Sequence, residues 1–272
     1  MKNLIKVLAI SMALVMFAGL FAACGEKKEA PATEAAEGGE LILGTSADYS
    51  PFEFIILDDK GEQQYVGIDI SVAEVIAEDM GKTLKVSNMD FDSLMAALSK
   101  GDVDIVIAAI EETPERLEAA DFSDPYYQDK PAKVLIKADK AETYTSTDAF
   151  SGKSVGAQTG TTKANLVGDE FEGANLVALA SVNDLVNQLV YDKIDAIVLD
   201  GAVAEQYAAS NDDLVIASVE LPDALPYCIA VQKGDPKGLL PSINETIEKL
   251  LSNDSIAAFS EAAAAVAEKA ID

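Results

Sequence analysis

The stretch DISVAEVIAEDMGKTLKVSNMDFDSLMAALSKGDVDIVIAAI, residues 69–110, alternates between two hydrophobic periods. Where apolar residues recur every three or four positions the pattern predicts a helix, and where they run together it predicts a buried strand. The stretch predicts helices at 69–80 and 92–100, each ended by a glycine, and strands at 84–89 and 104–110. Such alternation indicates a mostly parallel sheet covered by helices.

The same alternation continues on both sides of this stretch. Further strands are predicted at 41–46, 133–138, 153–158, 195–200 and 227–231, with helices near 161–171 and 181–192 and two terminal helices that begin near Pro236 and Asp254. This is enough apolar sequence for two cores of about 100 residues each, which is a usual domain size. We therefore expect an α/β protein with two lobes.

The N-terminal segment 1–23 has the composition of a signal peptide. A short basic start is followed by an apolar run that ends early, at small residues and a cysteine, in LFAAC. This block resembles the bacterial lipobox, which predicts lipidation of Cys24, although Phe21 stands where an aliphatic residue is usual. The alternative is a plain signal peptide with an incidental cysteine. The small, charged residues of 24–40 then predict a flexible tether to the membrane.

The composition excludes several classes of function. The chain has 20 basic and 47 acidic residues, a net charge of −27, and loss of the signal peptide would leave 18 basic residues against the same 47. Because such an acidic surface repels phosphate backbones, we expect no nucleic-acid partner. The sequence has no histidine, the commonest general base, and no metal or cofactor motif, which argues against an enzyme. Cys228 has no partner once Cys24 is lipidated, and we expect it to be buried.

Seven blocks of sequence, in order and with sensible spacing, carry a family resemblance. They are GTSADYSPFEF (44–54), YVGIDI (65–70), MDFDSL (89–94), GDVDIVIAA (101–109), TPERLEAADFSDPYY (113–127), GKSVGAQTGTT (152–162) and DAIVLD (195–200). Together they resemble the type II periplasmic-binding proteins that serve polar amino acids, solute-binding family 3, over essentially all of 41–272.

The resemblance implies how the chain divides. One lobe would combine 41–128 with 229–272, and the other would span 129–228. Two strands would join the lobes, crossing near 128–131 and 225–229. A ligand would be trapped between the lobes by a hinge motion.

A free amino acid needs a cation and an anion at its site, because removing both of its charges from water is otherwise costly. Arg116 in TPER stands where the family binds the ligand carboxylate, and its guanidinium can make two parallel hydrogen bonds. The alternative is a surface arginine paired with Glu112 or Glu115. Asp200, at the end of a predicted strand, stands where the family binds the α-ammonium; the alternative is a loop aspartate facing water. We expect Asp195 to be solvated or structural.

Five further residues fall where the family contacts its ligand. Thr161 and Thr162 open a predicted helix, whose free N–H groups favour an anion, and Gln158 lies on the same turn. Tyr49 and Phe91 stand where two rings enclose the ligand side chain. Taken alone, the threonines would be an ordinary helix cap and the rings ordinary core residues.

Glu111 departs from the family, which generally has Ser or Thr five residues before this arginine. An ionised glutamate cannot donate a hydrogen bond to a carboxylate and would repel it. Either its backbone amide alone serves the site, or the side chain turns away, or it meets a cationic ligand side chain. Ala109 is expected to offer its carbonyl oxygen to the ammonium.

The sequence thus predicts a monomeric, extracytoplasmic binding protein, anchored by lipid, that passes an amino acid to the permease of an ABC transporter. The acidic excess and Glu111 favour a basic or neutral amino acid. One alternative is a dehydratase-like enzyme on the same scaffold, with Glu111 or Glu53 as its acid. The other is a ligand-sensing module for a signalling partner.

Overall fold

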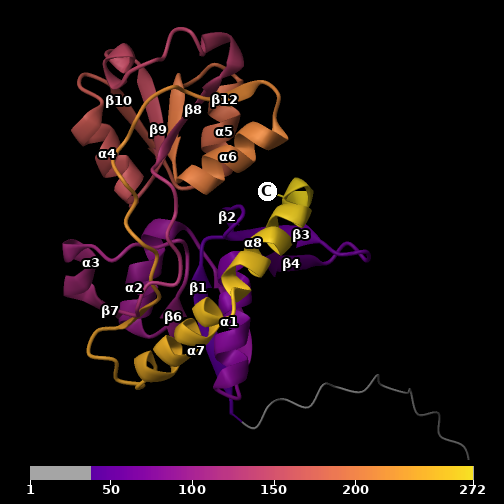
Figure 1. Cartoon of the computed structure of the whole chain (residues 1–272). Helices are drawn as coiled ribbons and strands as arrows, with labels where there is room; N and C mark the ends of the chain where they lie inside the picture. Colours follow the sequence, from indigo (N-terminus) through magenta and orange to yellow (C-terminus); the bar gives the residue numbers. More distant parts are fainter. Residues whose placement is uncertain (1–37, 272) are drawn as a thin grey trace, which may run out of the picture. The chain divides into compact units, whose positions relative to one another are not determined.

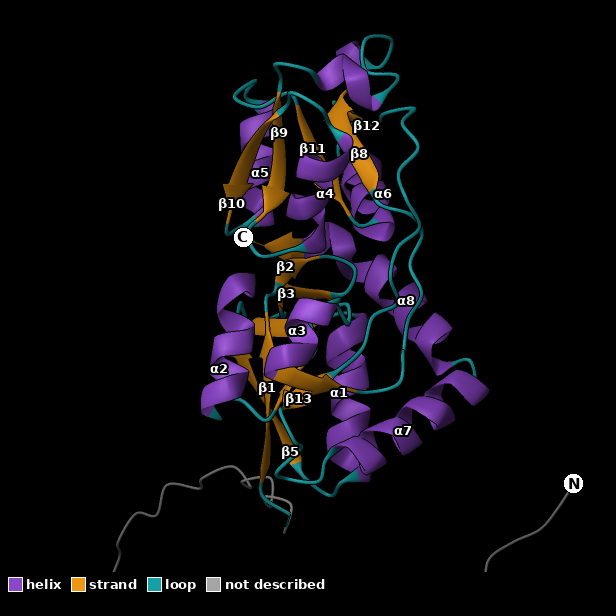
Figure 2. Cartoon of the chain, turned by 90° about the vertical axis from the view of Figure 1, so that its left-hand side faces the viewer, coloured by secondary structure: helices purple, strands orange, loops and turns teal. Residues whose placement is uncertain are grey.

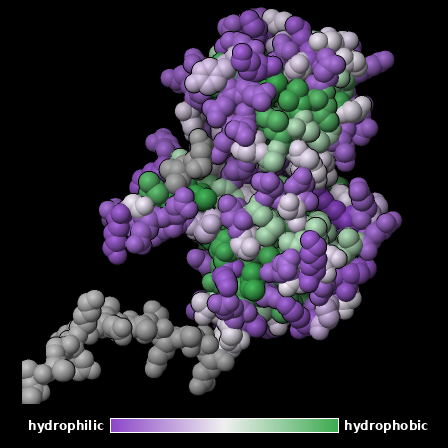
Figure 3. All heavy atoms as spheres, turned by 180° about the vertical axis from the view of Figure 1, so that it is seen from behind, coloured by the Kyte–Doolittle hydropathy of each residue, from purple (hydrophilic) through white to green (hydrophobic). Residues whose placement is uncertain are grey.

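The computed structural model describes residues 38–271, which fold around two five-stranded sheets (Figures 1 and 2). The predictions for the signal peptide, Cys24 and most of the tether lie outside the described residues. No helix within 38–271 has the length and apolar character needed to cross a bilayer. Figure 3 shows that hydrophilic side chains cover most of the face in view, in keeping with the excess of charged residues.

The first sheet has the strand order β5-β1-β6-β13-β7. Its strands are β1 (Glu40–Thr45), β5 (Thr83–Asn88), β6 (Ile105–Val106), β7 (Ala120–Phe122) and β13 (Ala230–Gln232). Strands β5, β1 and β6 are parallel, whereas β13 runs antiparallel to both β6 and β7. The main helices of this lobe are α1 (Ile68–Asp79), α2 (Leu94–Lys100), α7 (Leu240–Ser252) and α8 (Ser255–Val266). The helices predicted at 69–80 and 92–100 are therefore present, the second preceded by a short 3₁₀ turn η1 (Phe91–Ser93).

A small antiparallel sheet that sequence patterns did not predict lies in the same lobe. It consists of β2 (Asp48–Tyr49), β3 (Glu53–Leu57), β4 (Gln63–Val66) and β14 (Ala270–Ile271). Strands β2 and β3 form a tight hairpin, in which Tyr49 pairs with Glu53. This hairpin brings an aromatic ring and a buried carboxyl group to the edge of the lobe.

The second sheet has the order β10-β9-β11-β8-β12. Its strands are β8 (Lys133–Lys137), β9 (Ser154–Gln158), β10 (Asn175–Leu179), β11 (Ala196–Leu199) and β12 (Leu214–Ile216). Strands β10, β9 and β11 are parallel, whereas β8 is antiparallel to β11 and β12. Helices α4 (Thr162–Glu170), α5 (Val182–Val190) and α6 (Gly201–Ser210) pack around it (Figure 1).

Two chain segments connect the sheets, and they pair with each other. Tyr227 donates its N–H to the carbonyl oxygen of Tyr127 at 2.9 Å, and the two rings stack with centroids 5.8 Å apart. Phe52 contacts both rings edge-on. The Tyr227 hydroxyl donates to Asp129, whose carboxylate also accepts from the backbone of Ala202 at the start of α6.

Three predicted elements are shorter or displaced. Of the strand predicted at 104–110, only β6 is observed, because the chain then leaves the sheet and Ala109 takes the left-handed value φ 45°. The strand predicted at 227–231 begins at Ala230, since Tyr227 pairs with the other connecting segment instead. The helix predicted from Pro236 begins at Leu240.

Candidate functional site

Side chains from both lobes surround one small cavity, which they nearly fill. It is lined by Tyr49, Glu53, Phe91, Ala108, Ala109, Glu111, Gln158, Thr161, Lys163 and Asp200. Gln158 ends β9 and Asp200 follows β11, so both residues lie at the carboxyl edge of neighbouring parallel strands.

Asp200 connects the second lobe to the first. It is the residue before α6, and its carboxylate accepts a hydrogen bond from the Tyr49 hydroxyl at 2.7 Å. The same hydroxyl accepts from the Asp200 N–H at 3.2 Å. Burial raises the pKa of Tyr49 well above its ordinary value, and the charge of Asp200 raises it further, so Tyr49 stays a neutral donor.

Arg116 is the only arginine in a chain that otherwise uses lysine for its cations. It lies in α3 (Pro114–Ala119), a short helix whose N-cap Thr113 accepts from the Arg116 N–H. Its guanidinium donates to the carboxylate and the carbonyl oxygen of Glu111 at 3.0 and 2.9 Å, and to the carbonyl of Gly160 in the second lobe at 3.2 Å. The guanidinium carbon also lies 5.4 Å from the ring centre of Phe91, a cation–π contact.

Glu111 pairs with two cations of the chain itself. One carboxylate oxygen accepts from Arg116, and the other accepts from Lys163 at 2.6 Å and from the Thr162 hydroxyl at 2.7 Å. Burial of Glu111 opposes ionisation, but the charges of Lys163 and Arg116 outweigh it and lower its pKa to about 2. None of the three readings of Glu111 from the sequence included this arrangement. The pairing of Arg116 with Glu112 or Glu115 is also absent from the described ion pairs.

Lys163 is the residue that sequence reasoning missed. Its ammonium donates to Glu111 at 2.6 Å and lies 2.8 Å from the carboxylate of Asp200, and its side chain is only 7% exposed. Burial lowers the pKa of Lys163, but the charges of Asp200 and Glu111 reverse this and leave it raised. The available signal was its position directly after the two threonines, together with the need of Glu111 for a cation.

The start of α4 is held as a capped helix end. The Thr161 side chain accepts from the Ala164 N–H at 3.2 Å and donates to the carbonyl of Gln158 at 2.7 Å. The Gln158 amide donates to the carbonyl of Ala180 at 2.9 Å. Thr161 and Gln158 line the space, whereas Thr162 contacts it through Glu111.

A pair of buried acids lies on the first-lobe side of the space. Asp69 accepts from the Tyr126 hydroxyl at 2.6 Å and from the N–H of Ala109 at 2.7 Å, and it is hydrogen-bonded to Glu53. Burial raises the pKa of Asp69 to about 6. Burial, and then the charge of Asp69, raise the pKa of Glu53 well above its ordinary value, so Glu53 holds the proton. Among the described residues, no group bonds to its second oxygen, Oε2.

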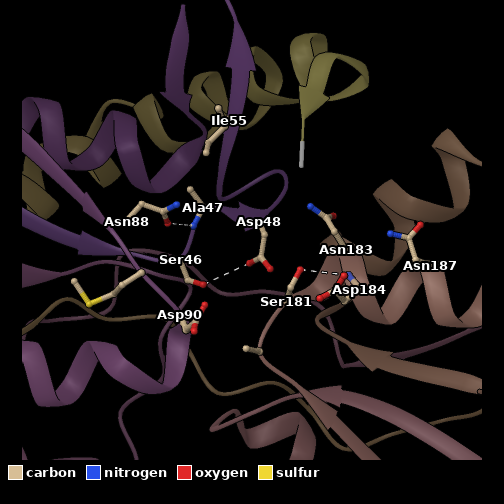
Figure 4. Close-up of a pocket in the computed structure, with 12 residues that line it drawn as sticks. Ser46, Ala47, Asp48, Ile55, Asn88, Asp90, Ser181, Asn183, Asp184 and Asn187 are labelled. Atoms are coloured by element: carbon tan, nitrogen blue, oxygen red, sulfur yellow. Dashed lines mark hydrogen bonds between the residues drawn. The ribbon is translucent and has the colours of Figure 1, made fainter.

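A larger space, of about 410 Å³, opens between the lobes beside Asp48 (Figure 4). The Asp48 carboxylate of the first lobe accepts from the N–H of Val182, the first residue of α5, at 2.7 Å. Burial raises the pKa of Asp48, and this bond counteracts the rise. No basic or aromatic residue is among the residues that line this space, so it lacks a cationic partner for a carboxylate. We therefore consider the smaller space the ligand site.

The structure brings the predicted site residues of both lobes together. Tyr49, Phe91, Ala109, Glu111, Gln158, Thr161 and Asp200 all line the one space, and Arg116 and Thr162 bond to Glu111 at its border. Asp195 lies elsewhere, where it accepts from Tyr144 and from the N–H of Ser154. Cys228 is buried, and burial raises its pKa to about 11. Two ionisable residues that line the space, Glu53 and Lys163, were not among the ligand-binding residues predicted from the sequence.

Solved structures share this architecture. An amino acid ABC transporter substrate-binding protein, AbpA from Streptococcus pneumoniae, solved bound to L-arginine, superposes with a TM-score of 0.80. The two sequences are 32% identical, and the match covers 84% of this chain and 96% of the other. The two-lobed type II periplasmic-binding-protein fold predicted from the sequence is thereby confirmed.

Curated relatives agree with the structural match. The arginine-binding extracellular protein ArtP of Bacillus subtilis is 37% identical over 188 residues, 68% of this chain and 69% of its own length. A probable histidine-binding protein of Campylobacter jejuni is 30% identical over 239 residues, 87% of this chain and 90% of its own. The family model of the bacterial extracellular solute-binding proteins, family 3, matches residues 41–263. This chain therefore belongs to the bacterial extracellular solute-binding proteins of family 3.

Proposed function

We propose that this chain is the substrate-binding component of an ABC importer and that its ligand is a free amino acid with a cationic side chain. The observation that carries the proposal is the convergence of opposite charges from two lobes on one small space. Arg116 would bind the ligand carboxylate, because its planar guanidinium matches a carboxylate with two parallel bonds. Asp200 would bind the α-ammonium, supported by the Tyr49 hydroxyl at 2.7 Å.

The preference for a cationic side chain rests on Glu53. Glu53 lines the same space as the rings of Tyr49 and Phe91, and its oxygen Oε2 is buried without a bonded partner among the described residues. A buried acceptor without a donor is costly, and a guanidinium or ammonium would satisfy it. The two rings would contact the aliphatic stem of such a side chain and attract its charge. The names of the relatives, arginine-binding for ArtP and L-arginine-bound for AbpA, support the same ligand class.

We propose that the lobes, 41–128 with 229–272 and 129–228, open and close about the segments 128–131 and 225–229. The enclosed space gives a ligand no room to enter without such opening. Gly160 supports close approach, since a Cβ there would lie 3.1 Å from that of Asp92 in the opposite lobe. Ligand contacts to both lobes would then favour the closed form.

The cellular setting completes the proposal. The chain would be exported, lipidated at Cys24 and held as a monomer outside the membrane, where it would deliver its amino acid to permease subunits. A dehydratase-like reaction on this scaffold would have to use Glu53 as its acid, because Glu111 is ionised with a pKa of about 2 and cannot serve as a general acid.

Thermal unfolding of the full chain in the presence of each common amino acid tests the proposal. A ligand at about a hundredfold over its Kd adds about 2.7 kcal/mol, which raises the Tm of a chain of this size by roughly 5–10 °C. We expect arginine or lysine to give this shift and Arg116→Ala to abolish it. Arg116→Lys should give an intermediate shift, because it keeps the charge and loses the paired geometry. A well-folded chain that responds to no amino acid would overturn the proposal.

A further inference from the structure

Four buried side chains form a string of alternating charge across the cleft. Arg116 contacts Glu111 at 3.0 Å, Glu111 contacts Lys163 at 2.6 Å, and Lys163 contacts Asp200 at 2.8 Å. The side chains are 11, 5, 7 and 3% exposed in that order. Every other ion pair within 38–271 has a partner that is at least 45% exposed. The string therefore differs from the surface pairs of the chain, which contribute little.

The two inner members of the string neutralise each other. Without Lys163, the cleft would hold one cation, Arg116, against the two anions Glu111 and Asp200. Glu111 would then be the only anion within reach of Arg116 and would retain it, and an arriving carboxylate would meet a net negative site. With Lys163 present the string is neutral, and Glu111 has a second partner on its other oxygen.

We propose that Lys163 is a positioning residue of the ligand site, whose ammonium holds the Glu111 carboxylate so that Arg116 can exchange Glu111 for the carboxylate of the ligand. The inference rests on the proposed amino-acid ligand and adds a residue to that site. During binding, one oxygen of Glu111 releases Arg116 while the other keeps Lys163 and the Thr162 hydroxyl. The ligand then bridges the two ends of the string, because its carboxylate binds Arg116 and its ammonium binds Asp200.

The string predicts a specific pattern of loss and rescue. In Lys163→Met, Arg116 is the only cation that pairs with Glu111. We therefore expect the affinity for L-arginine to fall at least 100-fold. Adding Glu111→Gln removes the unpaired charge and keeps a side chain of the same shape, so the double variant should recover to within about tenfold of the wild type. If Lys163 acted in folding alone, removing the charge of Glu111 would not restore the affinity for L-arginine.

The ligand supplies a second, independent readout. Agmatine has the side chain of arginine without the carboxylate, so Lys163→Met should weaken its binding far less than that of L-arginine. Calorimetric titration of the full chain with both ligands measures this, and the Tm of each variant checks folding. Lys137→Met, which removes a lysine paired with Asp192 at 2.9 Å on the surface of the second lobe, is the matched control and should bind like the wild type.

The possible outcomes separate the inference from the proposed function. If the wild type binds no amino acid, the proposed function fails and the inference with it. If the wild type binds and Lys163→Met binds as tightly or more tightly, the inference alone is overturned. If Lys163→Met does not fold, the charge-balanced double variant decides, since a folded double variant that does not bind L-arginine also overturns it.

Discussion

Glu111 and Glu53 are two buried glutamates beside the same space, and their pKa values move in opposite directions. Glu111 is 4% exposed and Glu53 is 1% exposed, so burial penalises the charge of both. Glu111 has Lys163 and Arg116 as neighbours, which lower its pKa to about 2. Glu53 has Asp69 as its neighbour, and its pKa rises well above the ordinary value. Neighbouring charge, and not depth, decides which of the two carboxyl groups is ionised.

The difference divides the site into two parts with separate tasks. The string from Arg116 to Asp200 is a fixed pattern of ionised groups, suited to the constant zwitterion of any amino acid. The Glu53–Asp69 pair holds a proton, which an arriving cation can replace. The first part would provide affinity for amino acids in general, and the second would select among their side chains.

The largest expected effect follows from breaking the charged part. Asp200→Asn removes the anion that pairs with Lys163 and that would bind the ligand ammonium, so an uncompensated buried cation remains. Breaking a buried pair in this way costs about 3–5 kcal/mol, and we expect L-arginine to bind roughly 150- to 5000-fold more weakly by calorimetry. Asp195→Asn, the same change at the other end of β11, should leave binding intact. An Asp200→Asn variant within tenfold of the wild type would contradict the division.

The protonated part should reveal itself in the pH dependence of stability. Asp69 has a folded pKa of about 6 against an ordinary 3.8, so the folded state holds more protons than the unfolded state between these values. The stabilisation is complete below pH 3.8 and is lost as the pH rises through about 6. Urea unfolding at pH 4 and pH 7 should show the wild type losing about 2 kcal/mol relative to Asp69→Asn. A difference that does not change with pH would show that Asp69 is not perturbed in this way.

Sequence reasoning predicted helices α1, α2, α4, α5, α7 and α8, most strands of the two large sheets, and the outer members of the string. It did not predict helices α3 and α6 or strands β7, β10 and β12. Arg116 was assigned from the family motif TPER, and Asp200 from the same resemblance and its place at the end of the strand predicted at 195–200. The β2–β3 hairpin was missed because its strands are too short to display a period, and with it the position of Glu53. Lys163 was missed because its role depends on Glu111, 52 residues away, and no local pattern records that contact.

The selectivity assigned to Glu53 can be tested by neutralising it. Glu53→Gln keeps the shape and removes the carboxyl group, so L-arginine should lose a charged hydrogen bond worth about 1.5–3 kcal/mol, or roughly 10- to 150-fold in affinity. L-glutamine, which has no side-chain cation, serves as the control ligand and should change little.

Proton exchange gives the same test a second readout. A cation that binds beside protonated Glu53 displaces its proton, so the affinity of the wild type for L-arginine should rise with pH while Glu53 remains protonated. Titration in buffers of different ionisation enthalpy should detect proton release for the wild type and none for Glu53→Gln. Equal proton release by both proteins would place the proton elsewhere.

The smallest effect separates lobe closure from ligand chemistry. Asp48 lies outside the ligand space and bonds across the cleft to the first N–H of α5, where the positive end of the helix dipole favours a carboxylate. Asp48→Ala should remove about 1 kcal/mol from the closed form only. Because closure is common to all ligands, L-arginine and L-glutamine should both weaken about fivefold. Asp184→Ala is the control, because it removes an acid from the first turn of the same helix that makes no inter-lobe bond, and it should change the affinity for neither ligand. A loss of affinity in Asp48→Ala for L-arginine alone would instead make Asp48 part of the site for the ligand side chain.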